Sequence, residues 1–417
     1  MPEKLECESK FGIYTFDLSE LGLRIRLDRI HERGDSISGE VTIENTAGDH
    51  IHTARLSLLD TAKKRSLASH LAKQINSLNW DTIIEGVSQA VIVAHRKGEP
   101  VIEIGQIPKR HTPRWRLEGI IPEGDITIMF GAGGTGKSML ALCFALSVQH
   151  GWSGLGLTPE AGNVLYLDWE WGWEEHNERL KSIEAGMELD FSPNIAYRYC
   201  HRALDTEIQE IHKIVIDRDI KLIIVDSAIP ALGGAKEAKE NSEPLFQALR
   251  SMPGATSLII SHQSKDPEQK VKSPYGDVFF VNRARHVLEA RSVMDSEDEI
   301  KIALYKHKSN LPPSLLRNRY PIGFHVAESD LGTTIESLDV RSVPELAERM
   351  SITSRIINAI KLQPSGIKVA ELAEALNVKP KSISQSLWRG KGRIFTSLDP
   401  QLKESRWALL SKETDSY

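Results

Sequence analysis

The chain has 417 residues, and its 52 Lys and Arg are nearly balanced by 57 Asp and Glu, which gives a net charge of −5. The length predicts about two to four domains, and the ordinary charged and apolar fractions are typical of a soluble globular protein. Three widely spaced cysteines suit neither a disulfide framework nor a zinc site, so we expect a reducing compartment. The N-terminus lacks an apolar signal segment, and the longest uncharged apolar stretch, residues 138–148, is shorter than the ~20 residues of a membrane span. These features predict a cytoplasmic protein that does not enter a membrane.

Residues 1–110 are expected to form an N-terminal α+β domain. Leu21, Leu23, Ile25 and Leu27 alternate with polar residues, and a turn at 33–36 leads to a second alternating run at 41–43. This pattern predicts a small antiparallel sheet. Two helical runs follow at about 53–76 and 80–97, and a strand-like run lies at 100–104. The segment contains no chemical motif, and we favour a role in packing or oligomerisation.

A phosphate-binding motif, G-x-x-x-x-G-K-S, occupies residues 131–138. It lies between a strand-like run at 125–130 and an apolar helical run at 139–146, which is the context that the motif requires. The N–H groups of the turn and the helix dipole converge on a phosphate, Lys137 reaches the β- and γ-phosphate oxygens, and Ser138 binds Mg²⁺. The sequence therefore predicts an ATP and Mg²⁺ site. Its expected residues are Gly131, Gly133, Gly134, Thr135, Gly136, Lys137, Ser138 and Met139.

Strands and helices alternate from 111 to 335, which indicates an α/β domain with a mostly parallel sheet. The expected strands are 127–130, 164–167, 196–200, 222–225 and 257–261, and their continuous apolar character fits a sheet covered on both faces. Two further runs, 287–292 and 300–305, have the alternation of an antiparallel sheet edge. A linker is expected at 336–350.

Two acidic residues follow apolar strands of this domain. We expect the strand at 164–167 to lie beside the phosphate loop, to end at Asp168 and to direct Glu170 at the γ-phosphate, where a carboxylate can deprotonate the attacking water. The alternative is that Glu170 only begins the next helix. The strand at 222–225 closes on Asp226, the Walker B pattern, whose carboxylate binds Mg²⁺ directly or through water.

Polar and basic residues farther along could complete the site. His262 and Gln263 follow the strand at 257–261, where α/β sheets bind ligands, and either could contact the γ-phosphate. A structural role for the histidine is the alternative. The cations Arg283, Arg285, Lys306 and Lys308 cannot be placed on the chain's own phosphates from sequence. They could reach the nucleotide of a neighbouring subunit, or form surface salt bridges.

Residues 351–417 are predicted to form a winged helix. Three apolar-striped helical runs are followed by two strands, at 393–397 and 406–410, and Asn377 can cap the second helix. The residues between 351 and 411 include ten Lys and Arg against four Asp and Glu, a net charge of +6 (10 − 4), so the rest of the chain carries −11. A basic module suggests an anionic partner, and we favour DNA over a protein partner. The expected contact residues are Lys381, Ser384, Gln385, Arg389 and Lys391.

The motifs GAGGTGKS, VLYLDWE, KLIIVDS and LIISHQSK, in this order, resemble a RecA-type P-loop ATPase core. They are more similar still to the hexameric replicative helicase family RepA of plasmids and its AAA-type relatives, over about residues 112–330. The resemblance implies that Glu170 is the catalytic base, Asp226 a metal ligand and His262 the γ-phosphate sensor. It also implies that Arg285 is an arginine finger acting on the next subunit, and that Lys308, in a terminal Lys-x-Asn motif, helps to bind the nucleotide.

The chain departs from that family in two places. The family often has two histidines where this chain has Ser261 and His262, which weakens the sensor assignment. The run of Trp169, Trp171 and Trp173 is unfamiliar, and we expect burial beside the start of the next helix rather than stacking on a base.

Rings of this type hold nucleic acid in a central channel, bound by the loops after the Walker B and sensor strands. In this chain those loops are 227–241, with Lys236 and Lys239, and 263–277, with Tyr275 and the expected DNA contacts Lys265, Lys270 and Lys272. The sequence thus favours an ATP-dependent DNA helicase that forms a homo-oligomer, expected as the family's hexamer, with single-stranded DNA in the channel and duplex at the winged helix. The alternatives are a non-motor, DNA-bound ATPase switch (a loader, regulator or recombination mediator) and a recombinase-like filament.

Overall fold

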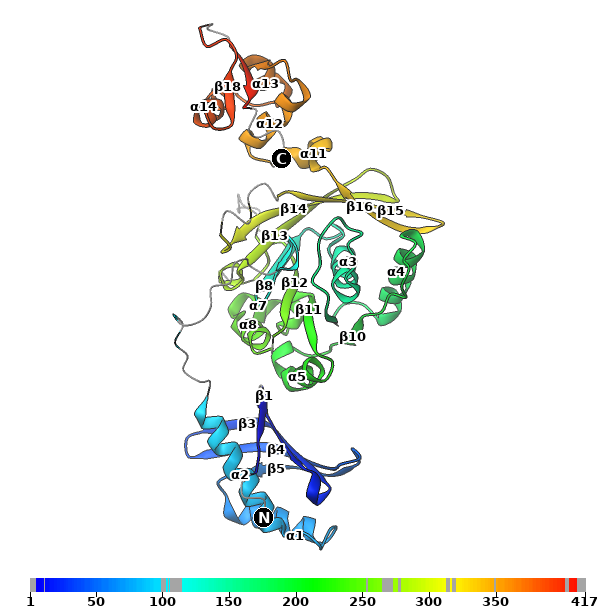
Figure 1. The fold of residues 1–417 in the computed structure, drawn as a ribbon, viewed down its shortest axis with the longest axis vertical. Coiled ribbons are helices and arrows are strands. Elements are labelled where there is room, and N and C mark those ends of the chain that lie inside the picture. The colour runs from blue at the N-terminus through cyan, green and yellow to red at the C-terminus, as the bar shows by residue number, and fades with distance from the viewer. Residues whose placement is uncertain are drawn as a thin grey trace. The chain divides into compact units, whose positions relative to one another are not determined.

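The computed structural model describes residues 5–10, 12–98, 103, 105, 115–252, 254–264, 273–276, 279–312, 316, 320–348, 350–401 and 405–410. Residues 1–112, with 206–217 and 251–253, form one compact unit, and the other residues form a second. Figure 1 labels the elements of both. Among the helices that the structure describes, none combines the length and the apolar character needed to cross a bilayer.

The N-terminal unit contains an antiparallel sheet whose five strands follow one another in chain order. The strands are β1 (Glu8–Lys10), β2 (Ile13–Leu18), β3 (Leu23–Arg33), β4 (Ser36–Asn45) and β5 (His50–Ser57). Leu23, Ile25 and Leu27 alternate with more exposed residues and are buried, as the period-2 pattern predicts. Leu21, expected on the same face, instead ends a 3-10 turn (Ser19–Leu21) and is 37% exposed.

Two helices, α1 (Thr61–Ala72) and α2 (Trp80–Lys97), bury their apolar faces in the same core as the sheet. The prediction of a helix from residue 53 is wrong, because residues 53–57 belong to β5 and pair with β4. Asp60 begins α1 by accepting the N–H groups of Ala62 and Lys63, which are the donors that a helix start leaves unpaired. Most of the strand-like run at 100–104 lies outside the described residues.

The second unit is built on a nine-stranded sheet. Its spatial order is β10 (Ala196–Tyr199), β9 (Asn163–Asp168), β11 (Ile220–Asp226), β12 (Thr256–His262), β8 (Ile126–Gly131), β13 (His286–Met294), β14 (Glu299–Ser309), β15 (Ile322–Ser329) and β16 (Gly332–Leu338). The strands from β10 to β13 are parallel, and those from β13 to β16 are antiparallel. All five expected parallel strands are confirmed. A short hairpin of β6 (Trp115–Leu117) and β7 (Ile121–Pro122) leads into β8.

The antiparallel part of the sheet differs from expectation in two ways. The run at 287–292 is parallel to β8, so the change of direction comes one strand later, between β13 and β14. The sheet also continues through β15 and β16, which the sequence did not predict.

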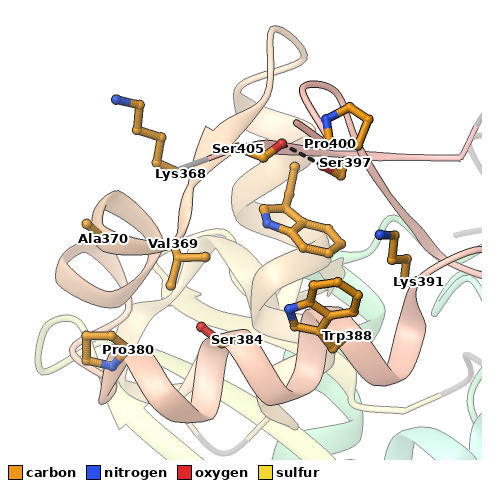
Figure 2. Close-up of a pocket in the computed structure, with 11 residues that line it drawn as sticks. Lys368, Val369, Ala370, Pro380, Ser384, Trp388, Lys391, Ser397, Pro400 and Ser405 are labelled. Atoms are coloured by element: carbon orange, nitrogen blue, oxygen red, sulfur yellow. Dashed lines mark hydrogen bonds between the residues drawn. The ribbon is translucent and has the colours of Figure 1, made fainter. Parts of the chain in front are cut away.

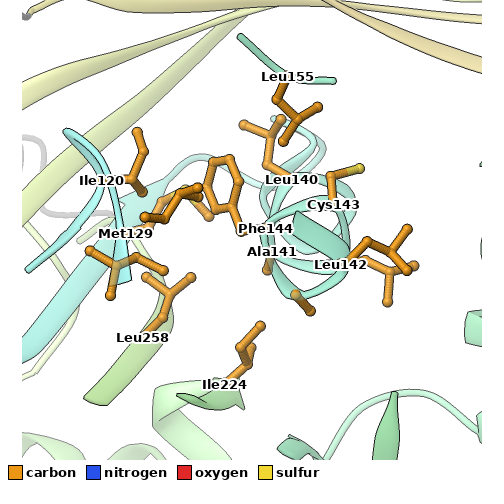
Figure 3. Close-up of a cluster of buried hydrophobic side chains, with 14 of the residues drawn as sticks. Ile120, Met129, Leu140, Ala141, Leu142, Cys143, Phe144, Leu155, Ile224 and Leu258 are labelled. Atoms are coloured by element: carbon orange, nitrogen blue, oxygen red, sulfur yellow. The ribbon is translucent and has the colours of Figure 1, made fainter. Parts of the chain in front are cut away.

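The helix that follows the phosphate motif, α3 (Lys137–His150), lies in the middle of the main core (Figure 3). Its residues from Leu140 to Leu146 are all buried, so it is apolar around its whole circumference, as a helix enclosed by other elements must be. The cluster around it includes residues of the parallel strands and of β14–β16, and Phe144 packs against Phe324 of β15 with ring centroids 5.8 Å apart. The antiparallel extension therefore covers a helix that the parallel strands alone would leave half exposed.

Further helices lie between these strands or after them in the chain, and one of them, α5, belongs to the first unit. They are α4 (Trp173–Gly186), α5 (Ile208–Asp217), α6 (Ala228–Ala231), α7 (Ala235–Glu240), α8 (Glu243–Arg250), α9 (Phe280–Arg283) and α11 (Pro344–Ala347), with 3-10 turns at Leu204–Thr206 and Val340–Ser342.

The C-terminal module has three helices and a small sheet with its own core. The elements are α12 (Ile352–Leu362), β17 (Ile367–Lys368), α13 (Val369–Ala375), α14 (Pro380–Gly390), β18 (Phe395–Ser397) and β19 (Arg406–Leu409), and the sheet order is β17-β19-β18. Asn377 has φ of 48°, in the left-handed region, where the predicted cap after the second helix requires it. The strand β17 was not predicted.

Candidate functional site: a phosphate loop and three carboxylates

The phosphate loop joins the carboxyl end of β8 to the first turn of α3. Its close packing requires glycine at two positions. A Cβ at Gly131 would lie 2.4 Å from the carbonyl oxygen of Ala290 on β13. Gly136 has φ of 74°, and a Cβ there would lie 2.5 Å from the side chain of Ile302 on β14. The loop is therefore fixed against the two strands beside it.

The ammonium group of Lys137 folds back over this loop. It donates to the carbonyl oxygens of Gly131 (3.3 Å) and Ala132 (2.6 Å) and to the hydroxyl of Thr135 (3.1 Å). Burial lowers the pKa of Lys137, and the negative charges of Asp226 and Glu170 act in the opposite direction. Both carboxylates therefore lie close enough to the ammonium group to interact with it electrostatically.

The loop has the features that a nucleotide phosphate needs. The first residue before α3 is a glycine, and no side chain caps the N–H groups of the first helical turn. These donors, at the positive end of a helix dipole, suit an anion, and the Lys137 ammonium lies over the same loop. The half-buried Met139 packs against the main core and anchors the helix start. The residues expected to bind ATP between Gly131 and Met139 thus lie in this loop and the start of α3, whereas Lys308 does not.

Asp226 lies at the carboxyl end of β11 and is buried. The Tyr166 hydroxyl donates to its carboxylate at 2.6 Å. Burial raises the pKa of Asp226, while hydrogen bonds from Tyr166 and Ser138 lower it and the charges of Glu170 and Asp168 raise it further. A serine hydroxyl in contact with an aspartate is a hard oxygen pair that suits Mg²⁺. Ser138 and Asp226 would hold this ion, and the ion would neutralise charge on the phosphates.

Glu170 follows β9 and turns toward Ser227, the residue after Asp226. The Ser227 hydroxyl, which is buried, donates a short hydrogen bond to its carboxylate. Glu170 precedes α4 and is exposed to solvent, as a group that must meet a water molecule requires. The side chain is thus linked to the Walker B segment.

The expectation that the β9 strand lies beside the phosphate loop is wrong. Two strands, β11 and β12, separate β9 from β8. Asp168 is instead the register partner of Asp226 on the neighbouring β11. Glu170 reaches the site because the carboxyl ends of these parallel strands share one edge of the sheet.

A buried network behind Glu170 holds its main chain in place. Asp168 is fully buried, and its Oδ1 accepts the N–H of Glu170 at 2.9 Å. Its Oδ2 lies 2.9 Å from Nε2 of His176 and accepts the Tyr197 hydroxyl at 3.0 Å. Burial raises the pKa of Asp168, but hydrogen bonds from His176, the Glu170 N–H and Tyr197 outweigh it, so the pKa is lowered. The charged form of Asp168 is therefore the one that organises the turn.

Replacing Asp168 with alanine will lower the rate of ATP turnover by about 100-fold, because a displacement of about 1 Å at a catalytic group has this effect. The KM for ATP will change little, since the phosphate loop does not contact Asp168 directly. Steady-state kinetics on the purified protein will measure both constants. Tyr197→Phe is the matched control, because it removes one of the bonds to Asp168 and leaves the Glu170 N–H in place. Equal losses in kcat for both variants would contradict this role.

The sensor strand β12 adjoins the phosphate-loop strand. The N–H of Gln263 donates to the carbonyl oxygen of Gly131 at 3.0 Å, and the carbonyl oxygen of His262 accepts the N–H of Tyr275 at 2.7 Å. Both His262 and Gln263 are half-buried. The main chain of Gln263 is therefore hydrogen-bonded to Gly131, the first residue of the phosphate motif. The main chain of its neighbour His262 is hydrogen-bonded to Tyr275.

Arg285, a candidate trans-acting cation, lies at the other end of β8. The N–H of Arg285 donates to the carbonyl oxygen of Ile126, the first residue of β8, at 3.3 Å. The strand spans five steps of about 3.3 Å each, so Arg285 lies roughly 16 Å from the phosphate loop of its own chain. Its side chain is 66% exposed and pairs with Asp125 at 3.1 Å.

The neighbouring cations are bound within the chain. Arg283 pairs with Glu243 at 2.5 Å, which is the salt-bridge alternative, and donates to Ser242. The Lys308 ammonium donates to the carbonyl oxygens of Val281, Asn282 and Ala284 at 2.8–3.0 Å and so closes the end of α9. Lys306 is exposed on β14. Lys308 lies on the part of β14 opposite Val287, near the start of β8, and so also lies away from its own phosphate loop.

The expected burial of the tryptophan run is wrong for two of its three members. Trp171 is 47% exposed and Trp173 is 60% exposed, while Trp169 is half-buried and donates its indole N–H to Arg202. The guanidinium of Arg179 lies 5.5 Å from the Trp171 ring centroid. The two exposed indoles lie around the turn after Glu170 because Asp168, and not a tryptophan, fills the space behind it.

The predicted nucleic-acid residues divide between described and undescribed segments. Lys265, Lys270 and Lys272 lie outside the described residues, as does the side chain of Lys239. The segment after Asp226 is not an open loop, because α6 and α7 form there, and Lys236 lies 4.0 Å from Glu240 on α7. In the C-terminal module, Lys381, Gln385, Arg389 and Lys391 are exposed and Ser384 is half-buried.

Four residues that shape this site were not assigned from sequence: Tyr166, His176, Tyr197 and Ser227. Each acts by a hydrogen bond to one of the carboxylates. Only Ser227 carried a signal, as a hydroxyl directly after the Walker B aspartate. The others are aromatic residues whose spacing looks like ordinary core.

Comparison with known proteins agrees with this site. Residues 96–268 match the model of a family described as an AAA domain. Among solved structures, the chain is similar to a KaiC-like protein from the hyperthermophilic archaeon Pyrococcus horikoshii, with 15% identity and a TM-score of 0.36, over 53% of this chain and 93% of that chain. No curated protein matches the chain. The segment that matches the family model contains the phosphate loop, Glu170, Asp226 and His262, and this segment is a P-loop ATPase domain.

Proposed function

We propose that the chain is an ATP hydrolase that moves along DNA as a hexameric RepA-like helicase, with ATP bound where subunits meet. The observation that carries the hydrolase part is the convergence of Lys137, Asp226 and Glu170. The two carboxylates influence the pKa of the ammonium group from strands far apart in sequence. A metal-binding carboxylate, a base and a phosphate-binding loop at one sheet edge are the parts that phosphoryl transfer to water needs.

Each residue has a separate task in this proposal. Lys137 and the N–H groups of the loop bind and orient the phosphates, and Ser138 and Asp226 hold Mg²⁺, which supplies charge neutralisation when bound. Glu170, held by Ser227 and by the Asp168 turn, positions a water molecule and accepts its proton. His262 or Gln263 responds to the γ-phosphate, and the bond from Gln263 to Gly131 supports this role.

The DNA part of the proposal rests on the C-terminal module, which we interpret as a winged helix. Its third helix, α14, follows a tight turn after α13 and exposes Lys381, Gln385 and Arg389. Basic and amide side chains on such a helix suit the phosphates and base edges of a DNA groove. The net charge of +6 between residues 351 and 411 supplies the general attraction to a polyanion.

The assembly part rests on Arg285. An exposed guanidinium held only by a surface carboxylate can exchange that partner at small cost, since exposed ion pairs contribute about 0–1 kcal/mol. Arg285 lies too far from its own phosphate loop to act there. It could instead act on the phosphate of a nucleotide bound to a neighbouring subunit.

The test combines ATP turnover, strand displacement and electron microscopy. The proposal expects ATP hydrolysis that single-stranded DNA stimulates, displacement of a strand from a partial duplex, and closed rings in micrographs with ATP and DNA. Tight DNA binding with slow, unstimulated hydrolysis would favour a non-motor switch. Open helical polymers would favour a recombinase-like filament.

A further inference from the structure

The C-terminal module contains a cavity that shares Ser384 and Lys391 with the expected DNA contacts and adds an aromatic surface to them. It has a volume of about 400 Å³ and lies between α13, α14 and the small sheet. Figure 2 shows its lining, with Trp388 and Lys391 together on one side and Ser384 directed inward from α14. The lining residues are Lys368, Val369, Ala370, Pro380, Ser384, Trp388, Lys391, Ser397, Pro400, Ser405 and Trp407.

The indole of Trp388 stands out because it is large, apolar and 63% exposed on a helix whose inner face is already filled. The inner face of α14 buries Ile383 and Leu387 in the module's core. Trp388 touches that core through Trp407, but most of its ring stays exposed, which needs another explanation.

The exposed indole is also held in place. It packs edge-to-face against Trp407 of β19, with ring centroids 5.9 Å apart and an interplanar angle of 72°. The Lys391 ammonium lies 4.3 Å from the Trp388 ring centroid. Trp407 is buried, so one indole fixes the other, and a fixed aromatic surface loses little entropy when it binds a flat ligand.

The chemistry of the lining selects the ligand. None of the lining residues is acidic, which suits an anion and disfavours a metal ion. An aromatic face, hydroxyl groups and an ammonium group are the combination that binds a nucleobase by stacking and its phosphate by charge. The side chain of Lys368 points away from Trp388 (Figure 2), which leaves Lys391 as the cation beside the stacking surface.

We propose that this cavity binds an unpaired nucleobase of DNA, stacked on Trp388 with its phosphate near Lys391. The inference rests on the proposed function, because it assumes that the module binds DNA, and it adds what the module recognises there. The paired bases of a continuous duplex are stacked on each other and cannot enter. The module would therefore prefer duplex DNA that carries unpaired bases, as at a fork or a bulge.

The experiment uses the full chain, without ATP, and two short DNA duplexes. One is blunt and fully paired, and the other carries a small bulge that contains 2-aminopurine, whose fluorescence falls when it stacks. The bulged duplex offers no free single strand to a channel. The proposal expects tighter binding of the bulged duplex, with quenching of the 2-aminopurine.

Trp388→Ala should lower the affinity for the bulged duplex by about ten- to a hundredfold, which is the usual effect of removing one stacking partner, and should abolish the quenching. It should leave the blunt duplex unaffected. Trp388→Phe should keep most of both signals, because it preserves an aromatic face. Trp173→Ala is the matched control, since Trp173 has a similar exposed fraction, 60%, in the ATPase domain.

Two outcomes would overturn the inference and are distinguishable from failure of the proposed function. If Trp388→Ala binds the bulged duplex as the wild type does, or weakens both duplexes equally, the cavity does not hold a base. Lys381→Ala should weaken both duplexes alike through loss of a phosphate contact. If the wild-type protein binds neither duplex and Lys381→Ala changes nothing, the DNA-binding function itself is wrong.

Discussion

Replacing Glu170 with glutamine will leave ATP binding intact and lower the rate of hydrolysis by about 10²- to 10⁴-fold, the usual contribution of a general base. Glutamine has nearly the same shape, and its amide oxygen can still accept the hydrogen bond from Ser227. It cannot take a proton from water. ATP binding will be measured by titration with a fluorescent ATP analogue, and turnover by phosphate release.

The control for this substitution is Glu174→Gln, which changes the same residue type in the first turn of α4. It should hydrolyse ATP at the wild-type rate. If Glu170→Gln also hydrolyses ATP at a near wild-type rate, Glu170 is not the base, and the observed bond to Ser227 is structural.

Replacing Arg285 with alanine will leave nucleotide binding almost unchanged and lower hydrolysis by about 10³- to 10⁵-fold, the range measured for arginine fingers. The expectation follows from the placement of Arg285 at the far end of β8, away from its own phosphate loop, and from the proposed ring, in which it would act on a neighbour's nucleotide. Mixing Arg285→Ala with Lys137→Ala protein should restore part of the activity. In such a mixture one subunit keeps its phosphate loop and the other supplies the guanidinium.

Asp125→Ala provides the control for Arg285, because Asp125 is its partner within the chain. If the salt bridge alone mattered, both variants would lose hydrolysis equally. If the guanidinium acts on a neighbour, Asp125→Ala will retain hydrolysis. A turnover rate per subunit that stays constant on dilution, together with no rescue in the mixture, would contradict the trans role and the ring proposal with it.

The sequence predicted the parallel strands and the motif residues because both follow from local rules. A continuous apolar run marks a strand buried on both faces, and a polar residue at its end marks the ligand-binding edge. Asp226 and Glu170 were found in this way. Local rules could not predict the spatial order of the strands. β8 and β9 are consecutive in the chain, but β11 and β12, which come later in the chain, lie between them in the sheet.

Other errors came from segments too short to show their period. The pattern of residues 53–57 fits a helix and a strand equally well over such a short length. These residues form a strand because they pair with β4. The strands β15 and β16 contain glycine and several polar residues, and their apolar positions have meaning only where they cover α3. The exposure of Trp171 and Trp173 depended on what filled the space behind the turn, which no local pattern reports.

The enclosed position of α3 has a consequence for motion in this domain. A helix that has no solvent-exposed face cannot separate from its neighbours by local unfolding, because any separation exposes apolar surface on every side. Its amide hydrogens should therefore exchange with solvent only when the whole domain unfolds, while those of the turn after Glu170 exchange by local opening. Movement during a cycle of ATP use must then be carried by the segments that lead away from the carboxyl ends of β9 and β11, while the phosphate loop stays in place.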